Sequence, residues 1–254
     1  MPSSIMKKAV VFDFDGVIVD SAHECWVVAL KTFKQMGEHL EDTKENKKKY
    51  MILRSFLRLA DDYYTIFKSI QQGIDVEKID LSSFRKTREH YVNEGKDFHK
   101  LFYENRNTMK KENITIWLDL HTVYPWVVDS IKELMGKYLV FIATNKDKLS
   151  TIDLLNHFGV NIPEEDILTK EFFLRKEDKL QKISEKYDLD MENILFVEDN
   201  LENLIEVQNA IREIKLALVD WSYVPSSQHD DARKLGMVVL NQKNLTAQIE
   251  AILK

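Results

Sequence analysis

The chain alternates between short apolar runs and longer amphipathic stretches, and this alternation predicts strands and helices. Four runs are apolar throughout, as expected of strands buried on both faces of a parallel sheet. They are Ala9–Phe12, Leu139–Ala143, Ile194–Val197 and Leu216–Val219, with a weaker run at Met237–Leu240. Helical spacing of apolar residues occupies the segments between them, at Val127–Met135, Ser150–Phe158, Lys179–Tyr187 and Leu201–Ile211. Alternating strands and helices predict a doubly wound, Rossmann-like α/β fold with a parallel sheet.

This alternation is interrupted once, between about Ser21 and Leu120. The stretch contains no convincing strand, and its apolar residues recur at helical spacing, as Trp26, Leu30 and Phe33 do. About a hundred residues of helix placed after the first strand predict a second, all-α unit.

The predicted organisation is therefore an α/β core domain with a helical insertion. The core domain is expected to comprise residues 1–20 and 121–254, and the inserted helical domain residues 21–120. Hinges are expected near Ser21–Ala22 and Leu120–Tyr124, because the chain crosses between the domains there.

Composition and charge narrow the classes of protein that fit. A formal charge of −6 gives no electrostatic footprint for nucleic acid or for an anionic membrane surface. No apolar run approaches the roughly 20 residues needed to span a bilayer, and Met1–Lys8 has no apolar signal core. The single cysteine, Cys25, excludes an internal disulfide and favours a reducing compartment. We expect a cytoplasmic protein that binds neither nucleic acid nor membrane; its oligomeric state is left open.

Polar residues follow three of the predicted strands at the point where each strand ends. Asp13 and Asp15 follow the first, Thr144 and Asn145 follow the second, and Asp199 follows the third. In open α/β sheets, ligands bind beyond the carboxyl ends of the strands. These side chains are therefore expected to converge on one crevice.

The spacing of the acids favours a metal-assisted reaction. Asp13 and Asp15 are two residues apart, so in extended backbone their side chains point the same way. A helix cap would explain one of them, but not the pair together with Asp199. Carboxylates gathered in one crevice repel one another unless a cation lies among them. Mg²⁺ prefers a few carboxylates together with water and a substrate phosphate, which points to phosphoryl transfer.

Four segments resemble, in order, motifs of the haloacid dehalogenase-like hydrolases, in the subgroup of phosphoglycolate phosphatase and β-phosphoglucomutase. Val10–Ser21, with the run Asp13-Phe14-Asp15-Gly16, resembles the first motif, and Phe141–Lys146 resembles the second. Phe196–Asp199 resembles the fourth motif, and Trp221–Tyr223 resembles a downstream Trp-Gly-Tyr with serine in place of glycine. The resemblance covers the α/β domain, and the helical insert lies where this subgroup carries its cap domain.

The resemblance implies a role for each of these residues. Asp13 would be the nucleophile that forms an aspartyl-phosphate, and Asp15 would protonate the leaving oxygen and later activate water. Thr144 would bind a phosphoryl oxygen, assisted by the amide of Asn145. Asp199 would hold Mg²⁺ together with Asp13 and the backbone carbonyl of Asp15.

The family also uses a lysine, and three candidates precede the fourth motif: Lys170, Lys176 and Lys179. Leu180 and Ile183 belong to one apolar helical face, and Lys176 lies on that face one turn earlier. We therefore expect Lys176 to be the catalytic and phosphate-binding lysine. Lys179 is expected to be rotated away from Leu180 toward solvent.

Two positions depart from the family pattern. Glu198 stands where the family most often has glycine, and the sequence leaves open whether it assists the metal, fixes a neighbouring basic group or faces away from Asp199. Asn203 stands where many relatives have aspartate, which reduces the negative charge of the metal site. Neither departure removes the nucleophile, the acid/base or the principal metal ligand.

The predicted function is a Mg²⁺-dependent phosphatase that acts on a small phosphorylated metabolite. A sugar phosphomutase would share Asp13 and Asp15, but the mutases that it resembles carry a histidine early in the cap helix. Cys25 stands at about that position here, and His23 is two residues out of register, which favours hydrolysis. A non-catalytic binding or regulatory protein of the same fold is the third alternative.

Overall fold

The computed structural model describes residues 7–254 and divides into two compact units. Unit 1 contains the described residues up to Asp20 together with Val123–Lys254, and unit 2 is Ser21–Thr122. The expectation about Met1–Lys8 falls almost wholly on residues 1–6, which lie outside the described part of the chain. Each unit is described by itself below.

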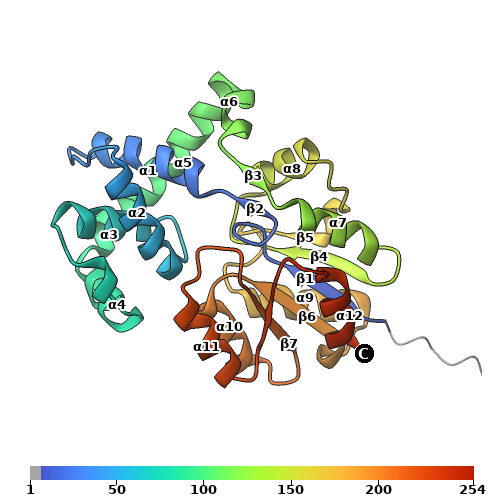
Figure 1. Ribbon diagram of the computed structural model, residues 1–254. Coiled ribbons are helices and arrows are strands. Elements are labelled where there is room, and N and C mark those ends of the chain that lie inside the picture. The colour runs from blue at the N-terminus through green and yellow to red at the C-terminus, as the bar shows by residue number, and fades with distance from the viewer. Residues whose placement is uncertain (1–6) are drawn as a thin grey trace, which may run out of the picture. The chain divides into compact units, whose positions relative to one another are not determined.

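Unit 1 is built on a six-stranded sheet whose strand order is β5-β4-β1-β6-β7-β8. The strands are β1 (Ala9–Phe12), β4 (Leu139–Ala143), β5 (Ile167–Leu168), β6 (Ile194–Glu198), β7 (Lys215–Val219) and β8 (Val238–Leu240). Every neighbouring pair is parallel. The chain order reverses beside β1, so the predicted doubly wound α/β fold is confirmed (Figure 1).

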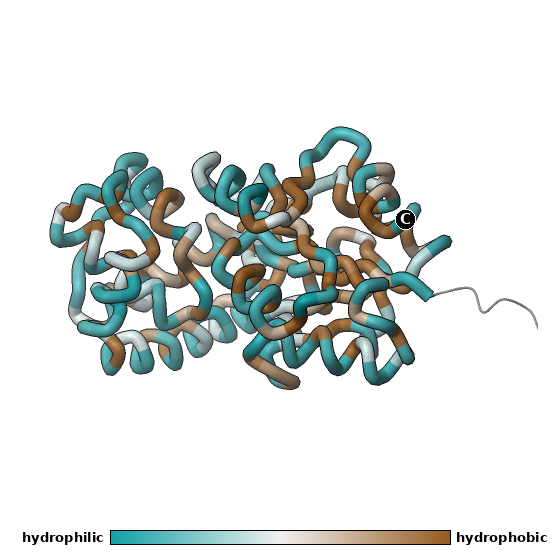
Figure 2. Tube along the Cα trace, turned by 90° about the horizontal axis from the view of Figure 1, so that it is seen from below, coloured by the Kyte–Doolittle hydropathy of each residue, from teal (hydrophilic) through white to brown (hydrophobic). Residues whose placement is uncertain are grey.

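Helices flank this sheet. They are α7 (Pro125–Leu134), α8 (Lys148–His157), α9 (Lys176–Tyr187), α10 (Leu201–Ala210), α11 (Ser226–Lys234) and α12 (Leu245–Leu253), with short 3-10 turns at Glu164–Asp166 and Met191–Asn193. Alternate strand residues such as Val11 and Phe196 form one core with Leu180 of α9 and Leu204 of α10. The intervening strand residues face the other way, and on that side α7 and α12 contact each other and the strands β4 and β6. In Figure 2, hydrophobic stretches of unit 1 gather toward its middle and hydrophilic ones lie toward its rim.

Unit 2 is helical from Ala22 to Asp119, as the periodicity predicted. Its helices are α1 (Ala22–Gln35), α2 (Lys44–Leu53), α3 (Asp62–Gln71), α4 (Leu81–His90), α5 (Val92–Glu112) and α6 (Ile114–Asp119), with 3-10 turns at Arg54–Phe56 and Val76–Lys78. Aromatic side chains fill its interior, and Trp26, Phe67 and Phe102 are almost fully buried. Among the described residues, no helix combines the length and the apolar character required to cross a bilayer.

Three strands were not predicted from the sequence, because each is only two residues long. One is β5, at the edge of the large sheet. The others are β2 (Val19–Asp20) and β3 (Thr122–Val123), which form a two-stranded sheet where the chain leaves unit 1 and returns to it. Two residues are too few to show the alternation or the apolar run by which strands are recognised.

Three helices begin earlier than predicted: α7, which begins at Pro125 rather than at Val127, and two whose starts shape the edge of the sheet. α8 begins at Lys148 rather than at Ser150, because the Asp147 side chain caps it and accepts from the Ser150 amide at 2.9 Å. α9 begins at Lys176 rather than at Lys179. Its first turn therefore contains both lysines.

Candidate active site

The carboxyl ends of three central strands meet at one edge of the sheet. Phe12, the last residue of β1, pairs with Ile142 of β4 and with Val197 of β6. The Asp13 amide continues the ladder by donating to the Val197 carbonyl at 2.8 Å. Residues that follow these strands are consequently held side by side by backbone hydrogen bonds.

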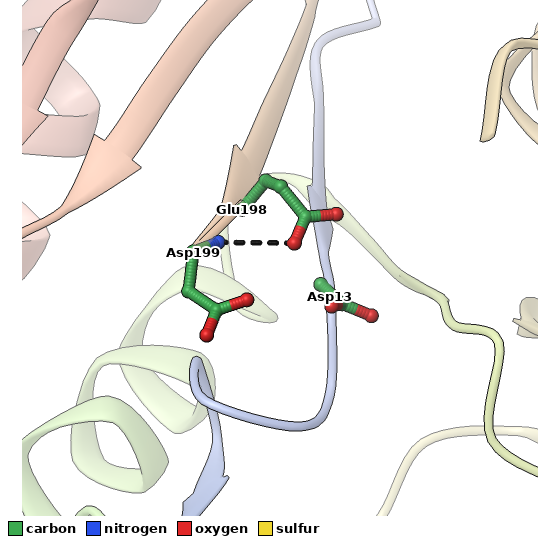
Figure 3. A group of neighbouring side chains, drawn as sticks. All are labelled: Asp13, Glu198 and Asp199. Atoms are coloured by element: carbon green, nitrogen blue, oxygen red, sulfur yellow. Dashed lines mark hydrogen bonds between the residues drawn. The ribbon is translucent and has the colours of Figure 1, made fainter. Parts of the chain in front are cut away.

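An acidic cluster lies at this edge. Asp13, Glu198 and Asp199 each offer a carboxylate oxygen, and these oxygens lie within 4.8 Å of one another. Figure 3 shows Asp13 following β1 while Glu198 and Asp199 come from the end of β6. Asp13 is 7% exposed and Glu198 is fully buried. Hard oxygen ligands this close together are suited to a divalent cation.

Lys176 places a positive charge within the cluster. Three oxygens surround its ammonium: Asp13 Oδ1 at 2.7 Å, Glu198 Oε2 at 3.0 Å and the Ala143 carbonyl at 2.8 Å. Burial alone would lower the pKa of Lys176, but the charges of Asp13 and Glu198 outweigh it and raise that pKa to about 12. Lys176 is therefore a permanent cation.

The Asp13 carboxyl experiences the opposite balance. Burial and the nearby Glu198 charge raise the pKa of Asp13 to about 7, although Lys176 acts to lower it. Positive charge next to Asp13, in addition to that of Lys176, would therefore stabilise its ionised form. A bound metal ion would supply this charge.

Glu198 is tied into the backbone at the start of α10. Its Oε1 accepts from the amides of Asp199 at 3.1 Å, the dashed bond of Figure 3, and of Asn200 at 3.2 Å. Its Oε2 accepts from the Asn203 side-chain amide at 3.3 Å. Asn203 donates where an aspartate would repel the buried charge. The two departures from the family pattern thus form one contact, in which an added acid is matched by an amide.

Asp15 is held by a lysine of the neighbouring loop. Lys146 Nζ lies 3.0 Å from Asp15 Oδ1, and the Lys146 side chain is almost fully buried. Thr144, at the end of β4, accepts at its Oγ1 from the Lys146 amide at 3.1 Å. The turn after β4 thus presents a hydroxyl and a cation at the same edge as Asp13.

Asp199 is positioned by the loop that follows β7. Ser222 Oγ donates to Asp199 Oδ2 at 2.6 Å. Gly16 lies against the same carboxylate, at a φ of +84°. A Cβ on Gly16 would overlap the Asp199 carboxylate and lie 2.6 Å from Ser222 Oγ. Only glycine fits this position, because both the φ and the space require it.

Comparison with known proteins identifies the family. A family model described as haloacid dehalogenase-like hydrolase matches residues 7–210. The chain belongs to this family. A comparison with curated proteins finds no match.

Solved structures share the fold over almost the whole chain. A haloacid dehalogenase-like family protein from Streptococcus pneumoniae has a TM-score of 0.65 at 15% identity, covering 98% of this chain and 99% of the other. A protein described as a predicted phosphatase from Clostridium acetobutylicum has a TM-score of 0.62 at 15% identity, with coverage of 97% and 99%. One described as a predicted phosphoglycolate phosphatase from Haemophilus somnus has a TM-score of 0.60 at 18% identity, with 98% of each chain covered. At these identities the likeness concerns the fold alone.

In this haloacid dehalogenase-like hydrolase, the residues predicted for the site lie at one edge of the sheet, but their contacts differ in kind. Asp13 and Asp199 share the acidic cluster, and Lys176 contacts Asp13 directly. The Asp15 side chain pairs with Lys146. Asn145 lies next to Thr144, and its side-chain oxygen accepts from Lys179 at 2.6 Å.

The expectation that Lys179 faces solvent is wrong, because its side chain is fully buried. The prediction considered the position of Lys179 around the helix relative to Leu180. Its position relative to Lys176, which lies at the site, decides where its side chain points. Residues three apart lie close together on a helix surface, so Lys179 shares the side of α9 that faces the sheet edge.

Sequence reasoning also left out Lys146 and Ser222. Lys146 directly follows Thr144 and Asn145, so its position after a buried strand was an available signal. Ser222 could not be found in this way, because only the folded loop brings it to Asp199.

Proposed function

We propose that this hydrolase is a Mg²⁺-dependent phosphatase that acts on a small phosphorylated metabolite through an aspartyl-phosphate on Asp13. The observation that carries the proposal is the environment of Asp13. It follows the central strand of the sheet, contacts Lys176 at 2.7 Å and shares an acidic cluster with Asp199. A carboxylate used as a nucleophile toward a phosphate needs nearby positive charge, because it attacks an anion.

Each residue of the site then has a task. Mg²⁺, held by Asp13, Asp199 and the backbone carbonyl of Asp15, would offset the negative charge of the phosphoryl oxygens. Asp13 would attack phosphorus, and Lys176 would orient its carboxylate and lie close to the phosphoryl group. Thr144 and the amide of Asn145 would hold a phosphoryl oxygen.

Asp15 would carry the proton in both half-reactions. It would first protonate the oxygen of the leaving group, and then, as the base, take a proton from the water that attacks the aspartyl-phosphate. Lys146, 3.0 Å from Asp15 Oδ1, would keep this carboxyl in place between the two steps.

The inserted unit supports the substrate class proposed here. We infer that unit 2 serves as a cap that selects small phosphorylated compounds, as the phosphatase names of two structural neighbours would fit. A cap of this kind excludes water and large substrates from the site.

Turnover of an aryl phosphate tests the function. The native chain should release phosphate with Mg²⁺ present, and excess chelator should abolish the release. A panel of phosphorylated metabolites should then contain at least one compound that is turned over faster than the aryl phosphate. A phosphomutase would instead convert a sugar phosphate into its isomer without net phosphate release. A binding protein would show neither reaction, and that result would refute the proposal.

A further inference from the structure

Lys179 is a buried amine without a counter-ion beside the candidate active site. Its side chain has no exposed surface. Its ammonium donates to Asn145 Oδ1 at 2.6 Å, and the structure gives it no ion pair among residues 7–254. Burying a lysine whose amine is held only by a neutral amide costs free energy of folding. A bound anion would offset this cost.

The neighbouring Lys176 differs in this respect. Its ammonium is surrounded by Asp13, Glu198 and the Ala143 carbonyl, so its charge is already matched by two acids. Lys176 and Lys179 lie one turn apart at the start of α9. The same helix turn therefore presents one lysine that two acids neutralise and one lysine with no acid bound to its amine.

The charges of the site indicate which kind of ligand Lys179 would bind. Four carboxylates and two ion-paired lysines gather at this edge: Asp13, Asp15, Glu198 and Asp199 with Lys146 and Lys176. One Mg²⁺ would balance them, and a phosphate monoester would then add up to two negative charges. Lys179, once protonated, would supply a positive charge that no other group of the site uses.

We propose that Lys179 binds the phosphate group of the substrate directly, as a second phosphate-binding lysine in addition to Lys176, and is held ready for it by Asn145. This inference rests on the proposed phosphatase function. Asn145 follows Thr144, so the ammonium lies beside the loop that would hold the phosphoryl oxygens. On binding, the ammonium exchanges the neutral Asn145 oxygen for an anionic phosphate oxygen, which forms a stronger, charge-assisted bond.

Protonation of Lys179 provides a signature that a purely structural lysine would lack. Burial and the charge of Lys176 lower the pKa of Lys179 to about 7, while Asp13, Glu198 and Asp178 act to raise it. Above pH 7 this side chain is therefore mostly neutral in the free protein. A bound dianion favours the charged form, so binding should take up about one proton, and phosphate affinity should fall as the pH rises above 7.

The test measures binding of inorganic phosphate in the presence of Mg²⁺ by calorimetry at pH 8, in two buffers of different ionisation enthalpy. Lys179→Met should weaken phosphate binding by roughly 10- to 100-fold, the effect of losing one charged hydrogen bond. It should also abolish the proton uptake of the native chain. Phosphate's own titration contributes equally to both proteins, so the difference isolates Lys179.

Two further measurements distinguish this role from general damage. Mg²⁺ affinity should not fall in Lys179→Met, because Lys179 contacts Asn145 and not a residue proposed to hold the metal, whereas a disordered site would bind both ligands worse. Lys179→Arg should retain most of the phosphate affinity. Lys182→Met is the matched control on the same helix, since its side chain is 56% exposed, and it should behave as the native chain does.

The outcomes separate this inference from the proposed function. Native affinity for phosphate in Lys179→Met overturns the inference alone, provided that the native chain hydrolyses the aryl phosphate. Absence of proton uptake in the native chain overturns it even if the variants fail to fold. A native chain that neither hydrolyses the ester nor binds phosphate refutes both.

Discussion

Asp13 and Asp15 are acids on the same loop, yet their surroundings differ. Asp13 is buried against Lys176, whereas the Asp15 side chain is 26% exposed and pairs with Lys146. A nucleophile must be held toward the phosphorus, while an acid/base must exchange protons with the leaving group and with water. The contrast fits the two roles proposed for them.

Replacing each aspartate by asparagine should separate these roles. Asp13→Asn removes the attacking oxygen, so no phosphoenzyme should form. Asp15→Asn should still form the aspartyl-phosphate from an activated aryl phosphate, whose leaving group needs little protonation, but should release it at least 100-fold more slowly. Rapid-quench labelling should detect a burst of phosphoenzyme in Asp15→Asn only. Label in Asp13→Asn, or on a serine or histidine of the native chain, would contradict the mechanism.

Gly16 gives a second prediction for a single residue. Gly16→Ala should reduce Mg²⁺ affinity by 10-fold or more, because the new Cβ overlaps the Asp199 carboxylate. Gly236→Ala is the matched control: its φ of +80° is nearly the same as the +84° of Gly16, but a Cβ there meets nothing within 4 Å. Both variants should lose about 1–2 kcal/mol of stability through strain at positive φ. Equal Mg²⁺ affinity in the two variants, measured by calorimetry, would show that the contact with Asp199 is unimportant.

At the scale of helices, unit 2 contains a buried ion pair that joins α1 to α5. Arg106 Nε and one terminal nitrogen each lie 2.7 Å from an oxygen of Glu24, and Trp117 Nε1 donates to the same carboxylate at 3.0 Å. Glu24 is fully buried and Arg106 is 3% exposed. The Glu24 charge raises the pKa of Arg106 further, even though burial acts to lower it, so the pair is ionised.

Removing one partner should harm unit 2 more than removing both. Arg106→Met leaves a buried carboxylate uncompensated and should cost about 3–5 kcal/mol, whereas Glu24→Leu combined with Arg106→Met should recover a large part of this loss. Chemical denaturation followed by tryptophan fluorescence measures the difference. Lys49→Met breaks the exposed pair with Glu45 and should have no measurable effect. A double variant less stable than the single would contradict the argument.

The longer strands of unit 1 could be predicted from the sequence, and the shortest could not. The runs at β1, β4 and β6 were recognised because strands buried on both faces are apolar throughout, whereas β5 was missed because Ile167–Leu168 is too short to form a pattern. The start of α9 was missed because Lys176 and Lys179 interrupt its apolar face. The same error led to the prediction that Lys179 faces solvent. Helical periodicity assigns charged residues to the exposed face and does not identify a polar crevice inside the protein.

The candidate site was predictable where it depends on position along a strand. Asp13 and Asp199 directly follow buried strands, so topology alone brings their backbones together. The contacts of Glu198 with Asn203, and of Ser222 with Asp199, depend on how loops fold back on the sheet edge. The cytoplasmic location remains a prediction from the single cysteine, which is buried in unit 2.

For the whole molecule, the division into two units predicts that unit 1 is self-sufficient. Val19–Asp20 and Thr122–Val123 are neighbours in one small sheet, so a short Gly-Ser linker can replace residues 21–121. The resulting protein should fold, bind Mg²⁺ within about tenfold of the native affinity and hydrolyse aryl phosphate, because the acidic cluster and the lysines all belong to unit 1. Its preference among phosphorylated metabolites should be reduced.

The same shortened protein carrying Asp13→Asn is the control for contaminating activity. Circular dichroism and calorimetry with Mg²⁺ report folding and metal binding separately from turnover. A shortened chain that does not fold would show that unit 1 depends on the insert, and one with unchanged substrate preference would refute the cap role.

The position of β1 in the sheet has a consequence for biosynthesis. This strand leaves the ribosome before its partners β4 and β6, which begin only at Leu139 and Ile194. At translation rates of 5–20 residues per second, roughly 6–25 s separate the synthesis of Phe12 from that of Leu139. During this interval the helices of unit 2 can form from local contacts while the apolar β1 has no strand to pair with. The nascent chain therefore exposes an apolar segment that is directly followed by Asp13, the proposed nucleophile, and a chaperone that binds there would protect the region of the candidate site.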